Sequence, residues 1–375
     1  MSERSIHVVF AEEDTLFRLM EMGLKRKLTP EGEKTLRYFF GPDSSTPLEV
    51  LATMADRLGL PADIDTTVCE DEPKLDHVLP TADFVVVEAS TLSTDRVKAC
   101  AGKTRLIQQF GRAYRNIDVA TARALNIPVA NLTRLSSQSS ADHITALILA
   151  LARNLLSAHR AVTIRRDPTQ PGTFAKDPPR NKFNWAGIRG FRILAYSTVG
   201  FLGLGENSGF VARRMRDLGA RVLYFKRARL SPHDESQYGG ISYAPLDELL
   251  AQADFVSLHL PYNKETDKFA GRELLSKMKR GAYLINSARG GIVDEEALYE
   301  AIKSGHLSGA ALDVYRYEPV PENCPLLELD NVLWSPHISG GEPEYMIAEA
   351  EAVLANIANV VHGKSPQNLV PEFRS

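Results

Sequence analysis

Three side chains with complementary acid–base chemistry follow three separate apolar segments in the second half of the chain. Arg289 lies in LINSARGG, Glu318 in GAALDVYRYEP and His337 in LWSPHISGG. Ligands of open α/β sheets bind just past the carboxyl ends of strands, where these residues are expected. Arginine offers a bidentate fork to a carboxylate, and a histidine beside a carboxylate donates a proton near neutral pH. These are the groups that reduction of a 2-keto acid needs, so we predict that all three are catalytic.

A glycine-rich stretch, VGFLGLGENSGFVARRM (199–215), is typical of a strand, a tight turn and a helix. Gly203 permits the turn, Gly205 allows a pyrophosphate to approach the backbone, and the small Ser208 stands where close packing is needed. Free N–H groups at the start of the helix would face the anion. The turn alone is also compatible with an ordinary connection, but the strands and helix around it favour a dinucleotide site.

The residues that end the next predicted strand, RVLYF, indicate the form of the cofactor. An acidic residue there would bind the adenosine ribose and repel a 2′-phosphate. This chain has Lys226, Arg227 and Arg229 instead. Two charge-assisted contacts of roughly 2 kcal/mol each would favour a 2′-phosphate by about two to three powers of ten. We therefore predict that NADP(H) is the preferred cofactor and NAD(H) the alternative cofactor. The other interpretation of the three basic residues is a solvated loop without a cofactor contact.

The composition limits the class of protein. The 375 residues, of which 44% are hydrophobic and 24% charged, suffice for two globular domains. A formal net charge of -3 provides no global field toward nucleic acid or membrane, so neither is expected as a partner. Cys69, Cys100 and Cys324 lack the spacing of a metal or disulfide framework, so no metal is expected. The N-terminus does not read as a signal peptide, which leads us to expect a cytoplasmic protein.

Short apolar segments alternate with helical patterns, which is typical of parallel α/β sheets. Strands are predicted at 6–11, 83–89 and 104–111, and then at 199–204, 221–226, 254–259, 282–286, 309–314 and 331–335. A long helix opened by capping serines is predicted over 139–160. An irregular connection, rich in proline, is predicted over 165–185. Two α/β units therefore follow one another in this chain.

These motifs, with HLPYNKETDKF (259–269) and NLTRLSSQSSADH (131–143), resemble the D-isomer-specific 2-hydroxyacid dehydrogenase family over about residues 83–345. The resemblance implies that Arg289 binds the substrate carboxylate and keto oxygen, and that His337 is the acid–base group. Glu318 would hydrogen-bond the histidine. The formate-oxidising branch of the family has glutamine at that position, so formate oxidation is disfavoured.

The resemblance also extends the predicted sites. It implies cofactor contacts from Glu206, Asn207, His259, Pro261, Thr266, Ser287, Ala288, Asp313 and Gly340. It implies substrate contacts from Ala89, Ser90, Gly111, Arg112 and Ala113, besides Arg289. Asp142 and His143 are expected to be structural.

The predicted substrate loop departs from the family pattern. In QQFGRAYRNID (108–118), Ala113 replaces a glycine and Arg115 replaces an acid. Arg112 and Arg115 would suit a phosphorylated or dicarboxylic keto acid, unless they are simply solvated. The chain before residue 83 is also longer than usual for the family, and residues 190–198 are additional.

Two doubly wound parallel-sheet α/β domains are implied by the resemblance. We expect a Rossmann cofactor domain over 132–337 and a flavodoxin-like substrate domain from 1–131 and 338–375, with the active site in the cleft between them. The expected activity is hydride transfer between NADP(H) and a small 2-keto acid, as in glyoxylate or hydroxypyruvate reductases, in a homodimer. One alternative is an NAD-dependent dehydrogenase of larger D-2-hydroxy acids, of the phosphoglycerate type. Another is a non-catalytic, nicotinamide-sensing protein similar to corepressors.

Overall fold

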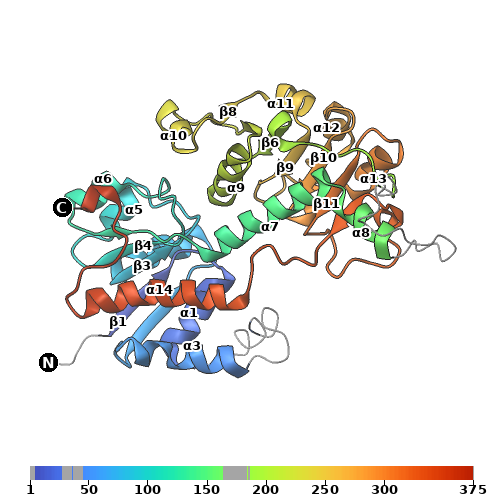
Figure 1. Cartoon of the computed structure of the whole chain (residues 1–375). Helices are drawn as coiled ribbons and strands as arrows, with labels where there is room; N and C mark the ends of the chain where they lie inside the picture. The colour runs from blue at the N-terminus through green and yellow to red at the C-terminus, as the bar shows by residue number, and fades with distance from the viewer. Residues whose placement is uncertain (1–4, 28–35, 37–44, 164–183, 185, 375) are drawn as a thin grey trace, which may run out of the picture. The chain divides into compact units, whose positions relative to one another are not determined.

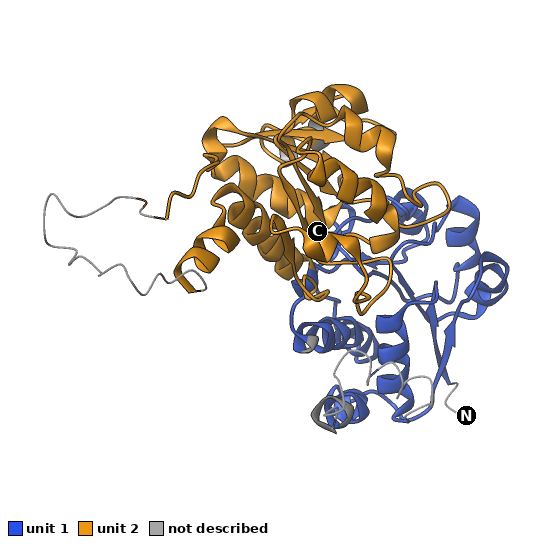
Figure 2. Cartoon of the chain, turned by 90° about the vertical axis from the view of Figure 1, so that its right-hand side faces the viewer, with its two compact units in different colours: residues 1–136, 341–375 blue, residues 137–340 orange. Residues whose placement is uncertain are grey.

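The computed structural model describes residues 5–27, 36, 45–163, 184 and 186–374. The chain divides into two compact units, residues 1–136 with 341–375 and residues 137–340 (Figure 2). The boundaries predicted after residues 131 and 337 remain a prediction of where the substrate and cofactor functions divide. The irregular connection predicted over 165–185 lies outside the described residues, except for residue 184.

The first unit is built on a five-stranded parallel sheet in the order β2-β1-β3-β4-β5 (Figure 1). Its strands are β1 (Ile6–Phe10), β2 (Ile64–Val68), β3 (Phe84–Val87), β4 (Leu106–Gln109) and β5 (Val129–Ala130). Successive side chains of β1 alternate between the faces, so Val8 and Phe10 enter one hydrophobic core. Val9 enters the core on the other face. Burial of both faces confirms the doubly wound, flavodoxin-like arrangement.

Helices cover both faces of this sheet. They are α1 (Thr15–Lys25), α3 (Ser45–Arg57), α4 (Glu72–Val78), α5 (Thr94–Ala99), α6 (Val119–Ala124) and α14 (Pro343–Val361), with short 3₁₀ turns at Leu79–Thr81 and Pro371–Phe373. The C-terminal helix α14 runs beside α1 in Figure 1. Its Ile347 and Leu354 are buried in the core that contains Phe10. The end of the chain therefore completes the hydrophobic core of its first part.

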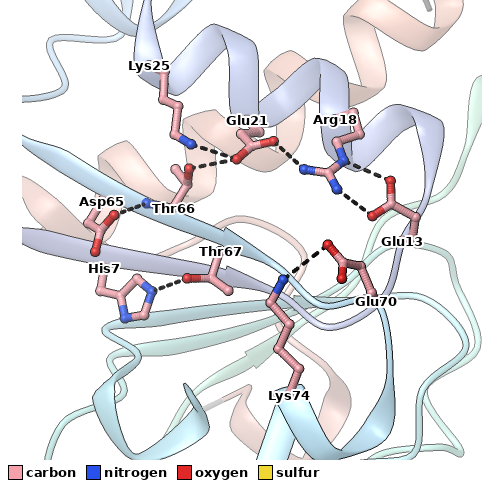
Figure 3. Close-up of polar contacts among 10 residues, drawn as sticks. All are labelled: His7, Glu13, Arg18, Glu21, Lys25, Asp65, Thr66, Thr67, Glu70 and Lys74. Carbon is pink, nitrogen blue, oxygen red and sulfur yellow. Dashed lines mark hydrogen bonds and ion pairs between the residues drawn. The ribbon is translucent and has the colours of Figure 1, made fainter. Parts of the chain in front are cut away.

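A buried carboxylate ties α1 to the sheet (Figure 3). Glu21 is 7% exposed and accepts from Lys25 Nζ at 2.8 Å, Arg18 Nη1 at 3.0 Å and Thr66 Oγ1 at 3.1 Å. Burial on its own would raise the pKa of Glu21, but the hydrogen bonds from Lys25 and Arg18 lower it below its usual value. Because its partners come from both α1 and β2, this carboxylate fixes the helix on the sheet.

The second unit contains a seven-stranded parallel sheet in the order β12-β11-β10-β9-β6-β7-β8 (Figure 1). Its strands are β6 (Thr198–Leu202), β7 (Arg221–Phe225), β8 (Ser242–Tyr243), β9 (Phe255–Leu258), β10 (Tyr283–Asn286), β11 (Gly309–Leu312) and β12 (Val332–Trp334). The order reverses between β6 and β9, which is the Rossmann arrangement, and the predicted fold class is confirmed. The short strands β2, β5 and β8 were not predicted.

The helices of the second unit lie on both faces of its sheet. They are α7 (Leu135–Ala152, which begins at the end of the first unit), α8 (Leu155–Thr163), α9 (Glu206–Asp217), α10 (Pro232–Gln237), α11 (Leu246–Gln252), α12 (Arg272–Lys277) and α13 (Glu295–Lys303), with 3₁₀ turns at Leu194–Tyr196, Gly290–Ile292 and Pro325–Glu328. Among the described residues, no helix is both long and apolar enough to span a membrane.

The single helix predicted over 139–160 is wrong in two respects. The helix α7 begins earlier, at Leu135, so the serines expected to cap it lie inside its first turns. It ends at Ala152, and a separate helix α8 begins at Leu155. Asn154 stands between them in the left-handed conformation, with φ of 48°. A left-handed residue cannot continue a right-handed helix, and asparagine tolerates this conformation better than most residues do.

The turn between β6 and α9 depends on the absence of a side chain at Gly203. Gly203 has φ of 94°, and an added Cβ would lie 2.3 Å from the carbonyl oxygen of His259, which follows β9. Close approach of these two loops occurs where the strand order reverses. At Gly205, in contrast, an added Cβ would meet no heavy atom within 4 Å, and φ is −126°.

Substitution of the two glycines should therefore separate stability from cofactor binding. We expect Gly203→Ala to reduce the free energy of unfolding by about 2 kcal/mol or more, because of the steric overlap and the positive φ. Gly205→Ala should retain the unfolding midpoint in urea but weaken binding of NADPH, measured by fluorescence titration. Equal destabilisation by both changes would contradict this account of the turn.

Candidate active site

The predicted catalytic and cofactor residues of the second unit gather at one edge of its sheet. Because all neighbouring strands are parallel, the loops that follow β6, β7, β9, β10, β11 and β12 share the carboxyl edge. The glycine turn follows β6, and the segment with Arg289 follows β10. Glu318 and His337 come after β11 and β12. The topology thus collects residues that are more than one hundred positions apart.

His337 and Glu318 form a direct pair. His337 Nδ1 lies 2.7 Å from Glu318 Oε2, and the backbone N–H of Tyr315 donates to Glu318 Oε1 at 3.0 Å. Because an ionised carboxylate only accepts hydrogen bonds, this geometry places the imidazole proton on Nδ1. The Nε2 atom is then the ring nitrogen that can exchange a proton with a substrate. The arrangement is that of a histidine acid–base group oriented by a carboxylate.

The buried carboxylate of Asp313 accepts hydrogen bonds from the turn that carries His337. Asp313 is fully buried and accepts from Ser335 Oγ at 2.7 Å and from the backbone N–H groups of Ile338 and Ser339, each at 3.0 Å. His143 Nε2 lies 3.4 Å from its Oδ1 and 2.9 Å from Ser335 Oγ.

Opposing effects act on the pKa of this carboxylate. Burial would raise the pKa of Asp313, but the hydrogen bonds from His143, Ser335, Ile338 and Ser339 hold it well below its usual range. Asp313 therefore carries a permanent charge that orders residues 335–339. His143 was expected to be structural, and its contacts with Asp313 and Ser335 support the segment that carries His337. Asp142, also expected to be structural, pairs with Arg214 at 2.7 Å.

Tyr315 joins the segment of Glu318 to the segment of His337, and its contribution was not predicted from the sequence. Its hydroxyl lies 2.7 Å from the carbonyl oxygen of Ser335 and 2.8 Å from that of Leu312. The Ser335 oxygen also accepts from the N–H of His337, at 3.1 Å, where His337 has φ of 55°. The Tyr315 ring stacks on Trp334 with ring centroids 5.4 Å apart.

Arg289 follows β10 in a loop shaped by Asn286. The Asn286 side chain donates to the Arg289 carbonyl oxygen at 3.1 Å and accepts from the Ala288 N–H at 3.1 Å. The Arg289 side chain is exposed, and its Nη1 donates to the Ala288 carbonyl oxygen at 2.7 Å. At Gly290, an added Cβ would lie 1.8 Å from the carbonyl carbon of Tyr315. The loop of Arg289 therefore packs directly against the loop that leads to Glu318.

The glycine turn fits the pyrophosphate of a dinucleotide. Ser208 Oγ accepts from the N–H of Gly205 at 2.7 Å and so caps the twelve-residue helix α9. Asn207 Oδ1 and Ser287 Oγ are among the buried side-chain oxygens that have no hydrogen-bond partner in the described part of the chain. Buried polar atoms without partners are rare and call for an explanation. Both residues were predicted to contact the cofactor, and donors on a bound nucleotide would satisfy these atoms. Glu206 is the first residue of the same helix.

Charged neighbours surround the predicted 2′-phosphate site after β7. Arg229 is held by Glu235, with Nε 2.9 Å from Oε1, and its guanidinium lies 5.6 Å from the ring centroid of Tyr243. Arg227 pairs with Glu265 at 3.1 Å, although both side chains are largely exposed, at 86% and 76%. Lys226 directly follows the strand. Three cations thus stand at the strand end, and Arg227 and Arg229 each pair with a glutamate.

The loop after β9 contains three predicted cofactor residues, His259, Pro261 and Thr266. His259 Nε2 lies 2.9 Å from Ser257 Oγ, and burial lowers the pKa of His259 to about 3, so this imidazole is neutral near pH 7. Thr266 Oγ1 donates to the carbonyl oxygen of Pro261 at 2.7 Å, which closes the loop. Gly340 ends the second unit and is half-buried.

The predicted substrate residues of the first unit follow β3 and β4. The backbone N–H groups of Ala89 and Ser90 donate to the Glu12 carboxylate, at 3.1 Å and 2.7 Å. Gly111 has φ of 131°, whereas Arg112 and Ala113 are exposed. The role of Glu12 was missed because nothing in the sequence links residue 12 with residues 88–90. Only the pairing of β1 with β3 brings them together.

Comparisons with known proteins agree with this geometry. The family model described as D-isomer specific 2-hydroxyacid dehydrogenase, NAD binding domain, matches residues 145–339. A glyoxylate reductase of Korarchaeum cryptofilum is 36% identical over 75% of this chain and 81% of its own length. A D-3-phosphoglycerate dehydrogenase of Archaeoglobus fulgidus is 34% identical over 83% of this chain, but that alignment spans 55% of the relative. The crystal structure of the PH0520 protein from Pyrococcus horikoshii has a TM-score of 0.58 and 25% identity, and the alignment covers 98% of this chain and 96% of that one.

The chain belongs to the D-isomer specific 2-hydroxyacid dehydrogenase family. It is an oxidoreductase that acts on the CH–OH group of a 2-hydroxy acid with a nicotinamide cofactor. The corepressor-like alternative is accordingly not favoured.

Removal of one hydroxyl tests whether Tyr315 positions the acid–base pair. We expect Tyr315→Phe to lower kcat by about tenfold with little change in KM, because the Ser335 carbonyl loses a hydrogen bond worth about 1 kcal/mol. Tyr299→Phe is the matched control, since Tyr299 lies on α13 with its hydroxyl near Lys303. An unchanged kcat in Tyr315→Phe, or a change in KM alone, would contradict the positioning role.

Proposed function

We propose that this enzyme reduces a small 2-keto acid of the glyoxylate or hydroxypyruvate type to the D-2-hydroxy acid, with NADPH as the preferred cofactor. The observation that carries the proposal is the His337–Glu318 pair at the same sheet edge as the glycine turn. Glyoxylate reductases among the relatives, with 34% to 36% identity, support the substrate class.

Each catalytic residue has a distinct task in this proposal. Arg289 binds the substrate carboxylate and polarises the keto oxygen through its guanidinium. His337 donates the proton from Nε2 to that oxygen as the alkoxide develops. Glu318 retains the Nδ1 proton on His337 and stabilises the imidazolium before proton transfer. When bound, the nicotinamide cofactor supplies the hydride.

The cofactor would be held by residues whose buried side-chain oxygens have no hydrogen-bond partner within the described part of the chain. Asn207 and Ser287 offer such oxygens, and the N–H groups at the start of α9 would face the pyrophosphate. Lys226, Arg227 and Arg229 replace the acidic residue that NAD-specific sites use. The family resemblance further supports a homodimer, which we include in the proposal together with a cytoplasmic location.

A comparison of the two cofactors tests the proposed preference. We expect kcat/KM to be roughly one hundred times higher with NADPH than with NADH. Arg227→Ala should reduce this ratio by about tenfold, because one charge-assisted contact is lost. Arg221→Ala is the matched control, since Arg221 begins the same strand at its opposite end and bonds Gln252. A preference of the unmodified enzyme for NADH would contradict the proposal.

A panel of keto acids tests the proposed reaction. Oxidation of NADPH is measured with glyoxylate, hydroxypyruvate, 2-ketogluconate, phenylpyruvate and phosphohydroxypyruvate. We expect the first two to give the highest kcat/KM. His337→Ala should lower kcat by roughly two to four powers of ten, and Arg289→Ala should raise KM as well.

The matched control for the catalytic histidine is His159→Ala, because His159 is exposed on α8. Highest activity with phosphohydroxypyruvate would favour the phosphoglycerate-type alternative. A kcat of His337→Ala that equals that of the unmodified enzyme would contradict the assigned acid–base group.

A further inference from the structure

The sheet of the first unit has its own ligand-binding edge. Its strand order reverses between β1 and β3, because the chain passes from β1 outward to β2 and from β3 toward β4 and β5. Open α/β sheets bind ligands outside the carboxyl ends of the strands at such a reversal. The loops at this point are Ala11–Glu12, after β1, and Glu88–Ser90, after β3.

Three consecutive backbone N–H groups in the second loop converge on one carboxylate. The N–H of Ala89 lies 3.1 Å from Glu12 Oε1 and that of Ser90 lies 2.7 Å from Oε2, and the N–H of Glu88 also donates to Oε1. Asn116 Nδ2 donates to the Ser90 carbonyl oxygen at 2.9 Å and so braces the loop. Successive N–H groups of this kind form a concave anion-binding site, or nest. We call residues 88–90 the amide nest.

An external anion would meet two obstacles at the amide nest. Glu12 is tethered to the chain, so it competes at a high effective concentration. Other acidic groups lie close to it: burial raises the pKa of Glu88, Arg134 opposes this effect, and the negative charges of Asp14 and Glu12 add to it. A second anionic group of a ligand is therefore disfavoured here.

Gln109 indicates what this edge accepts instead. Gln109 ends β4, is 2% exposed, and donates from Nε2 to the Glu88 carbonyl oxygen at 2.9 Å. Its Oε1 is buried without a hydrogen-bond partner in the described part of the chain. A buried acceptor of this kind is satisfied by a ligand that brings a donor, such as a hydroxyl group.

We propose that the amide nest is an anion site which Glu12 fills from within, and that Glu12 thereby restricts the enzyme to 2-keto acids whose far end is uncharged. A hydroxyl at the far end fits this edge, whereas a phosphate or a second carboxylate does not. Glu12 is thus a specificity-determining residue. The inference rests on the proposed function, because it names the substrate class of that enzyme.

Two substrates that differ by one phosphate provide the kinetic test. The ratio of kcat/KM for phosphohydroxypyruvate to that for hydroxypyruvate should be below about 0.1 in the unmodified enzyme and should rise at least about tenfold in Glu12→Ala. Glu12→Gln keeps the side-chain volume, removes the charge and should raise the ratio in the same direction. The matched control is Glu13→Ala, because Glu13 lies on the same loop but pairs with Arg18 (Figure 3).

Inorganic phosphate provides a readout that is independent of turnover. Phosphate, compared with chloride at constant ionic strength, should raise the unfolding midpoint of Glu12→Ala by about 2 °C or more beyond its effect on the unmodified enzyme and on Glu13→Ala. Phosphate that binds at the glycine turn affects all three proteins alike and cancels in this comparison.

The outcomes separate this inference from the proposed function. An equal phosphate response in all three proteins, or an unchanged substrate ratio in both Glu12 variants, overturns the inference while hydroxypyruvate reduction still supports the proposed function. Absence of turnover with every keto acid overturns the proposed function and the substrate restriction, and a phosphate response specific to Glu12→Ala would then support the amide nest alone.

Discussion

The sheet edge that carries His337 and Glu318 depends on one buried negative charge. Asp313 is fully buried at the end of β11, and its two oxygens accept from Ser335, Ile338 and Ser339, which all belong to the segment after β12. These bonds are stable because a carboxylate in a low-dielectric setting is expensive to leave unpaired. The segment is thereby fixed in the shape that gives His337 its left-handed backbone and its contact with Glu318.

Both sheets use the same constraint to build a site, namely the reversal of strand order at the carboxyl edge. In the second unit, the loops after β6 and β9 approach so closely that the His259 carbonyl leaves no space for a Cβ at Gly203. In the first unit, the loops after β1 and β3 are joined by the Glu12 carboxylate and the N–H groups of residues 88–90. At the reversal in the second unit, the backbone N–H groups at the start of α9 are donors for an anion. At the reversal in the first unit, the Glu12 carboxylate accepts from the backbone N–H groups. This difference is the physical basis for assigning a dinucleotide to the edge of the second unit and an uncharged group to the edge of the first unit.

Local patterns in the sequence were sufficient for segments with continuous apolar character, even where the strand itself has only three or four residues. The strands from β6 to β12 were predicted within a few residues, apart from the two-residue β8, which has too little periodicity to detect. The helix over 139–160 was wrong because its apolar pattern continues across Asn154, where the backbone turns left-handed. The start of this helix was also predicted wrongly, because a serine that caps a helix cannot be distinguished in sequence from a serine inside its first turn.

The sequence by itself determined which residue types were present and in which order: the glycine turn, the basic residues after β7, and the separate Arg289, Glu318 and His337 motifs. These are local features, because each lies on one strand and the loop after it. Only the tertiary structure decided which side chains contact these loops. Asp313 and Tyr315 hydrogen-bond the segment of His337, and Glu12 accepts from the amide nest. These contacts join segments that are far apart in the chain, and their distances depend on the packing of neighbouring strands, which no local pattern encodes.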